Sequence, residues 1–244
     1  MICPNCRHSQ SNENAKFCED CGTPLLKTTG EGQQANAYLE NAKQASRLYF
    51  KFFASALKSP AAYAKGVGRE QFINGIITIV LYSLVVPLII YFGFHRLAGW
   101  IDYPFLDLVL RPALAFAIMS ILTVAYCFLA IKYGKGKGNF QEVAARFGVY
   151  LVPFTALLLL ALLMAILQVN MLQSLLLMVG LFGAMFAVPA FVISSLMPEE
   201  GGMFDRLQST ILVYIASSIT VGLLGNVLFG RIGRLLGDGM SLFY

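Results

Sequence analysis

Five long apolar runs constrain this chain more than any other feature of its sequence. They cover residues 72–94, 112–131, 147–167, 174–197 and 207–230. Each is close to the roughly 20 residues that an α-helix needs to cross a bilayer. Charged residues make up only 13% of the chain, whereas an average soluble domain has about 25%. The sequence therefore predicts an all-α polytopic membrane protein, with five transmembrane helices inside a domain at residues 71–232.

The loop charges predict the orientation of these spans. The region before the first span and the 132–146 loop hold most of the basic residues, whereas the 168–173 loop has none. Lys and Arg favour the cytoplasmic side of a membrane. We therefore expect a cytoplasmic N-terminus and, after five spans, a short external tail at residues 233–244.

A cysteine-rich module precedes the spans, at residues 1–27. Its pattern is Cys3-x2-Cys6-x11-Cys18-x2-Cys21. Four thiolates from two Cys-x-x-Cys turns satisfy tetrahedral zinc and leave no open position for catalysis. So short a module cannot bury a sufficient core, so we expect one structural Zn²⁺ per chain to supply most of its stability. A disulfide pair or an iron site are the alternatives.

The letters CPNC, KFCEDCG and TPL resemble the short N-terminal zinc ribbons of many bacterial membrane proteins. Some zinc ribbons bind nucleic acid, which requires a basic patch. In this module the basic side chains are balanced by acidic ones. They are Arg7, Lys16 and Lys27 against Glu13, Glu19 and Asp20. We therefore expect no nucleic-acid partner.

A linker and a basic helix are expected between this module and the first span. Residues 28–37 are polar and contain glycine, which is typical of a flexible linker. In residues 38–70, basic residues recur at steps of four and seven, which keeps them on one side of a helix. They are Lys43, Arg47, Lys51, Lys58, Lys65 and Arg69. We expect such a helix to bind anionic lipid head groups on the cytoplasmic leaflet; the alternative is a basic flank that only orients the first span. Pro60 is expected to end or kink the helix.

The spans themselves contain no Asp, Glu, Lys, Arg or His. Proton relays and ion coupling depend on such residues, and no nucleophile–base motif occurs elsewhere. The Gly-rich loop at 134–138 lacks the spacing of a phosphate loop and is interpreted as a flexible positive turn. We therefore expect no enzymatic activity.

Small and polar residues within the spans predict how the helices pack. Pairs of small residues four apart allow close helix approach, within the bundle or, alternatively, in a homo-oligomer. The pairs are Ala161 with Ala165, Gly180 with Ala184, Gly183 with Ala187, and Ser218 with Gly222. Asn74 and Asn226 are expected to form hydrogen bonds between helices. Pro87, Pro153 and Pro189 are expected to be tolerated inside spans.

The stretch GKGNFQEVAARFGVYLVPFTALLLL resembles the bacterial branch of the Yip1 superfamily. The matching positions are Gly138, Phe140, Val143, Tyr150 and Pro153. The resemblance covers about residues 50–230, and it implies a five-helix Yip1-like domain in a bacterial cell membrane. The signature DLYGP of the eukaryotic relatives is absent, so their role with small GTPases is not implied.

Together these patterns predict a non-enzymatic membrane scaffold or regulatory protein whose cytoplasmic zinc ribbon docks a cytoplasmic or membrane protein partner. The alternative is a transporter, channel or lipid-handling protein. The prolines inside the spans favour that alternative, and the absence of charge inside the spans opposes it.

Zinc content tests the interpretation of the cysteine module. The purified protein should carry about one zinc per chain, because four thiolates complete one tetrahedral site. Replacing Cys18 by Ser (Cys18→Ser) should remove the metal and expose the N-terminal segment to protease while the spans stay inserted. Elemental analysis and limited proteolysis measure both effects. A wild-type module that resists protease without metal would contradict the prediction.

Reporter fusions test the orientation. A fusion after Lys137 should report a cytoplasmic position and one after Gly239 an external position, because the loop charges place the N-terminus inside. An alkaline phosphatase reporter, active only outside, makes the measurement. A phosphatase-inactive fusion after Gly239 would show that the number of spans is even.

Overall fold

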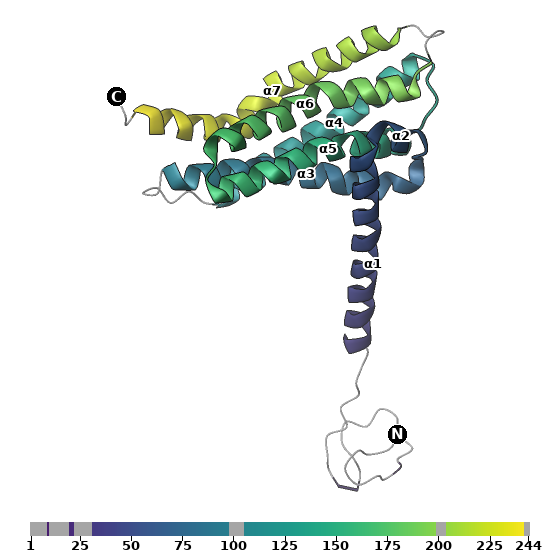
Figure 1. The fold of residues 1–244 in the computed structure, drawn as a ribbon, viewed down its shortest axis with the longest axis vertical. Helices are drawn as coiled ribbons and strands as arrows, with labels where there is room; N and C mark the ends of the chain where they lie inside the picture. Colours follow the sequence, from purple (N-terminus) through teal and green to yellow (C-terminus); the bar gives the residue numbers. More distant parts are fainter. Residues whose placement is uncertain (1–8, 10–19, 22–30, 98–104, 199–203, 242–244) are drawn as a thin grey trace. The chain divides into compact units, whose positions relative to one another are not determined.

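The structure is a computed structural model, and it describes residues 9, 20–21, 31–97, 105–198 and 204–241. The chain divides into two compact units, Met1–Phe50 and Lys51–Tyr244. The second unit contains a bundle of five long helices (Figure 1). These are α3 (Phe72–Leu97), α4 (Arg111–Tyr133), α5 (Phe140–Leu167), α6 (Asn170–Leu196) and α7 (Arg206–Ser241).

Five of the described helical segments are long and apolar enough to cross a membrane, one for each expected span, which confirms the helical class for the described part of the second unit. Two helices extend beyond the apolar runs. α5 begins at Phe140 rather than at residue 147, because the Asn139 side chain accepts a hydrogen bond from the Glu142 N–H at 3.0 Å and caps the helix. α7 continues to Ser241, so most of the expected tail at 233–244 is helical.

The segment before the spans differs from expectation at its start. α1 covers Glu31–Lys58, so residues 31–37, which we assigned to a flexible linker, are helical. The physical reason is that this stretch consists mostly of Gln and Ala, which favour helix, and Gly32 alone strongly opposes it. The expected break is confirmed: α1 ends at Lys58, and α2 (Pro60–Lys65) begins with the proline in a first-turn position.

The last turns of α1 and the whole of α2 are anchored within the second unit. Phe52 and Ala56 of α1 are buried, as is Ala64 of α2. The Phe52 and Tyr63 rings pack edge to face with centroids 5.8 Å apart. α2 also packs against α5. The apolar side of this segment is therefore packed within the second unit, whereas its basic side chains are exposed. These are Lys51, Lys58, Lys65 and Arg69.

The tightest helix crossing joins α3 and α5 at two glycines. A Cβ added to Gly148 would lie 2.3 Å from the Cα of Gly75, and a Cβ added to Gly75 would lie 2.8 Å from the Ala144 carbonyl oxygen. No residue with a side chain fits such a contact, so glycine is required at both positions. α5 has many buried residues around this crossing, including Val143, Ala145 and Val149.

α5 and α6 form the tight hairpin that the sequence predicts. α5 ends at Leu167, Gln168 adopts a left-handed conformation with φ of 70°, and α6 begins at Asn170. Three of the expected pairs of small residues belong to these two helices. Gly180 faces Leu158 and Gly183 faces Phe154, each closely enough that a Cβ would clash. Packing of the pairs within the bundle is therefore confirmed for this hairpin.

Of the two other expectations about helix packing, one stays open and one is wrong. A Cβ added to Gly222 would meet no atom of the described residues within 4 Å, so the pair Ser218 and Gly222 packs no described helix closely, and its alternative role in a homo-oligomer stays a prediction. Asn74 donates to the Gln71 side chain at 2.6 Å, which is a bond along the chain and not one between helices. The Asn226 side chain lies outside the described residues. Pro87, Pro153 and Pro189 lie inside α3, α5 and α6, as expected.

The α3–α5 crossing predicts an asymmetry between two glycine substitutions. Gly148→Ala should lower the free energy of unfolding by about 1–3 kcal/mol, the usual cost of overpacking, because the new methyl group meets the Gly75 backbone. Gly222→Ala is the matched control, since it faces open space and should leave stability unchanged or slightly raised. Denaturant titration in detergent micelles makes the comparison. Equal stability of the two variants would contradict the crossing.

Candidate functional site

Three of the four expected zinc ligands, Cys3, Cys6 and Cys18, lie outside the described residues. The fourth, Cys21, is described and exposed. No group of three or more His, Cys, Asp or Glu that could hold a metal occurs within the described part of the chain. Zinc prefers a set of four thiolates such as these cysteines would offer. Because three of the four ligands lie outside the described residues, the zinc site stays a prediction from sequence.

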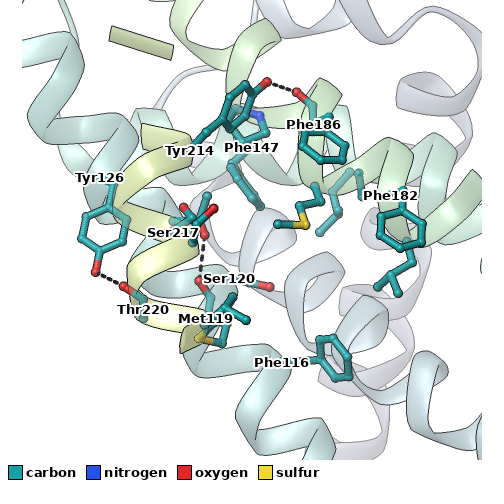
Figure 2. A pocket seen from close by; sticks show the side chains of 18 of the residues that line it. Phe116, Met119, Ser120, Tyr126, Phe147, Phe182, Phe186, Tyr214, Ser217 and Thr220 are labelled. Carbon is teal, nitrogen blue, oxygen red and sulfur yellow. Dashed lines mark hydrogen bonds between the residues drawn. The ribbon is translucent and has the colours of Figure 1, made fainter. Parts of the chain in front are cut away.

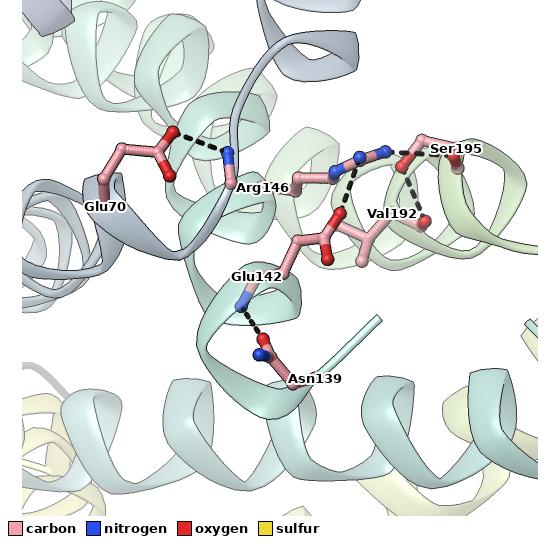
Figure 3. A network of polar contacts seen from close by, with 7 residues as sticks. Glu70, Asn139, Glu142, Arg146, Val192 and Ser195 are labelled. Carbon is pink, nitrogen blue, oxygen red and sulfur yellow. Dashed lines mark hydrogen bonds and ion pairs between the residues drawn. The ribbon is translucent and has the colours of Figure 1, made fainter. Parts of the chain in front are cut away.

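A polar network closes one end of the bundle, where α3, α5 and α7 begin; we call it the entry end (Figure 3). Arg146 of α5 pairs with Glu142 at 2.8 Å and donates to the Ser195 carbonyl of α6 at 3.0 Å. Arg206, at the start of α7, donates twice to the Met197 carbonyl, at 3.0 and 2.7 Å. The last carbonyls of a helix lack helical donors. The two arginines supply them and place positive charge at the negative end of α6.

This arrangement changes the role of Arg146. We assigned Arg146 to the 132–146 loop as an orienting charge, but the structure places it inside α5 with only 11% of its side chain exposed. Local sequence could not reveal its contact with Ser195, because that carbonyl is 49 residues away along the chain.

The glycine-rich loop at 134–138 also belongs to the entry end. The Gly134 N–H donates to the Ala130 carbonyl at 2.9 Å and the Gly136 N–H to the Ile131 carbonyl at 2.8 Å, so the loop caps the end of α4. A Cβ on Gly136 would lie 2.9 Å from the Leu196 carbonyl oxygen, so the loop packs on the end of α6. We interpreted it as a flexible turn, whereas the structure shows a cap that leaves Lys135 and Lys137 exposed.

A cavity of about 390 Å³ lies within the bundle and is lined mostly by α4, α6 and α7 (Figure 2). Tyr82 of α3 and two residues of α5 complete the lining. This volume lies within the usual range for small-molecule sites. At 1.5 Å per residue, Ser217 lies ~16 Å along α7 from Arg206. The hydrocarbon core of a bilayer is about 30 Å thick. The distance from Arg206 to Ser217 is thus about half of that thickness.

The cavity wall is mostly aromatic and aliphatic. Prominent members are Phe116, Met119, Phe147, Phe182, Met185 and Phe186. None of its lining residues is Asp, Glu, Lys, Arg or His. Pro189 also lines it and has no N–H, so the Met185 carbonyl has no helical donor at that position.

Hydroxyl groups form the polar part of the wall. The Tyr126 and Thr220 hydroxyls share a hydrogen bond of 2.7 Å between α4 and α7. Tyr214 donates to the Phe186 carbonyl and joins α7 to α6. Ser217 differs, because its Oγ is buried and has no hydrogen-bond partner among the residues that the structure describes. The cavity can thus hold an uncharged, mainly hydrocarbon molecule.

These hydroxyls were not among the residues that the sequence patterns singled out. A signal was present, because α7 is the least hydropathic of the five spans. It also carries Tyr214, Ser217, Ser218 and Thr220 within two turns. Their partners on α4 and α6 could not be read from the sequence.

Comparison with known proteins finds one well-matched relative. The chain is 37% identical over 224 residues to the uncharacterized protein YvbI of Bacillus subtilis (strain 168), and the match covers 92% of this chain and 94% of YvbI. No family model matches the chain. No solved structure matches it.

Proposed function

We propose that this chain, which belongs to the family of YvbI, is a non-enzymatic membrane scaffold or regulatory protein whose N-terminal zinc ribbon docks a protein partner. The observation that carries the proposal is the anchoring of α1 in the second unit through Phe52 and Ala56. α1 is one continuous helix that begins at Glu31, immediately after the cysteine-rich segment. A module joined in this way stays tied to the membrane protein, and tethering raises its effective concentration for a membrane-bound partner.

The exposed lysines support a second part of this proposal, the binding of anionic lipid head groups. They extend from Lys51 to Lys65 before the spans and from Lys132 to Lys137 after α4. Each basic residue close to an anionic membrane surface contributes about 1 kcal/mol. The lysines would hold the entry end against the cytoplasmic leaflet. The last turns of α1 belong to the same unit and would be held there too.

A second candidate function is lipid handling, and the cavity between α4, α6 and α7 favours it. The uncharged lining gives no support to ion transport or proton coupling, which use ionisable side chains inside the membrane. The scaffold and lipid-handling functions concern different parts of the chain, so each can be tested without the other.

Deletion of residues 1–30 tests the scaffold function. Proteins crosslinked to the full chain in its native membrane should disappear, because the docking module is gone. Membrane level and thermal stability should stay unchanged, since these residues belong to a unit separate from Lys51–Tyr244. Crosslinking followed by mass spectrometry and a thermal melt make the two measurements.

Two substitutions serve as matched controls for the deletion. Cys18→Ser should reproduce the loss of partners, because it removes a zinc ligand. Cys127→Ala removes the cysteine buried in α4 and should leave the crosslinked set unchanged. Unchanged partners after the deletion would refute docking by the ribbon, and an unfolded bundle would show that the ribbon is structural.

A further inference from the structure

We infer that the cavity between α4, α6 and α7 binds a hydrocarbon chain of a bilayer lipid, which enters between α6 and α7 and is held by the apolar part of the wall. This inference rests on lipid handling, the second candidate function. It specifies which part of the lipid is bound and from which side it enters. A chain can bind in the cavity without being transferred between membranes, so binding is tested separately from transport.

The exposure of the lining residues shows where the cavity opens. Its inner side is closed, because Tyr82, Phe147 and Ala184 are each at most 6% exposed. The large apolar lining residues that are exposed all belong to α6 and α7. They are Phe182 at 48%, Met185 at 42%, Phe186 at 53% and Val221 at 43%. The cavity therefore opens sideways between α6 and α7, two helices that are apolar enough to cross a membrane.

The cavity extends along three helices for about two to three turns of each. Its lining covers residues 116–126 of α4, 181–189 of α6 and 214–221 of α7. At 1.5 Å per residue these stretches are ~15, ~12 and ~10 Å long. Helices that cross a membrane tilt on average only about 20° from the bilayer normal. A lipid chain beside α6 and α7 therefore runs in nearly the same direction as the cavity and can enter it along its length.

The surroundings of the cavity supply its occupant. Protein interiors are close-packed and contain few voids larger than a water molecule, so a space of about 390 Å³ is large for an empty one. An apolar cavity stays dry and accepts apolar guests. Only 11% of the most apolar window of α7 is buried, against 44% of that of α5. In a membrane, hydrocarbon chains are the apolar molecules that surround so exposed a helix.

The polar groups of the lining show that the chain, and not the head group, is the part that binds. Most lining hydroxyls already bond a backbone carbonyl or each other. These are the hydroxyls of Tyr82, Thr123, Tyr126, Tyr214 and Thr220. The lining has no Asp, Glu, Lys, Arg or His, and the Ser217 Oγ is sealed from the cavity. Moving a head group out of water without new hydrogen bonds costs free energy, so the head group stays outside.

Photolabelling of the full chain in lipid nanodiscs tests the inference. The probe is a phosphatidylcholine with a diazirine near the middle of one chain, and the competitors are hexadecane and hexadecanol. Label should appear on the lining peptides of α4, α6 and α7, and both competitors should displace it equally, because the wall selects the chain. Absence of label from these peptides, or label that excess hexadecane leaves unchanged, would overturn the inference. So would a preference for hexadecanol of about fivefold, the ratio that one net hydrogen bond produces.

Variants assign the label to the cavity. Ser120→Leu on α4 and Val221→Phe on α7 each place a larger apolar side chain in it, and each should remove most of the label that hexadecane displaces. Gly222→Leu is the matched control, because its new side chain starts where no described atom lies within 4 Å and Gly222 does not line the cavity. It should label like the wild type, and a thermal melt checks that each variant is folded. Unchanged label in both filled variants, or an equal loss in Gly222→Leu, would refute binding in the cavity and leave the scaffold function untouched.

Discussion

The contact between the backbones of α3 and α5 at Gly75 and Gly148 is the interaction on which the rest of the bundle depends. Helices in lipid gain nothing from leaving water, so close packing must hold them together. The two glycines allow that packing, and the α5–α6 hairpin adds Gly180 and Gly183 on the next face. α3, α5 and α6 thereby form the packed part of the bundle. α4 and α7 bury much less of their surface, and the cavity lies where they meet α6.

At the entry end, side chains and loop backbone supply hydrogen-bond partners to the unpaired backbone groups of the helix ends. Arg146 and Arg206 serve the last carbonyls of α6, Asn139 caps α5, and the glycine loop caps α4. These contacts satisfy polar groups of the helix ends with one another, and the lysine side chains of this end stay exposed. The last turns of α1, which carry the buried Phe52, belong to the same compact unit.

Several elements could be predicted because their cause is local. The five spans follow from the length of their apolar runs, the break at Pro60 from its missing N–H, and the α5–α6 hairpin from the short segment between two runs. The expected linker was wrong over residues 31–37, because we took polarity as a sign of flexibility although Gln and Ala favour helix. The expected role of Asn74 was wrong because Gln71, one turn earlier, supplies a closer partner than another helix.

The sequence by itself determined the class of the protein: five apolar helices long enough to span a membrane, with no ionisable side chain in their apolar cores. It also predicts a zinc site from two Cys-x-x-Cys pairs. These follow from composition and from residues near one another along the chain. Only the tertiary structure decided that Gly75 meets Gly148, that Arg146 reaches Ser195, and that Tyr126 and Thr220 lie across one cavity. Such pairs join helices far apart in sequence. Apolar spans have many acceptable neighbours in lipid, and only the packing of the whole bundle selects among them.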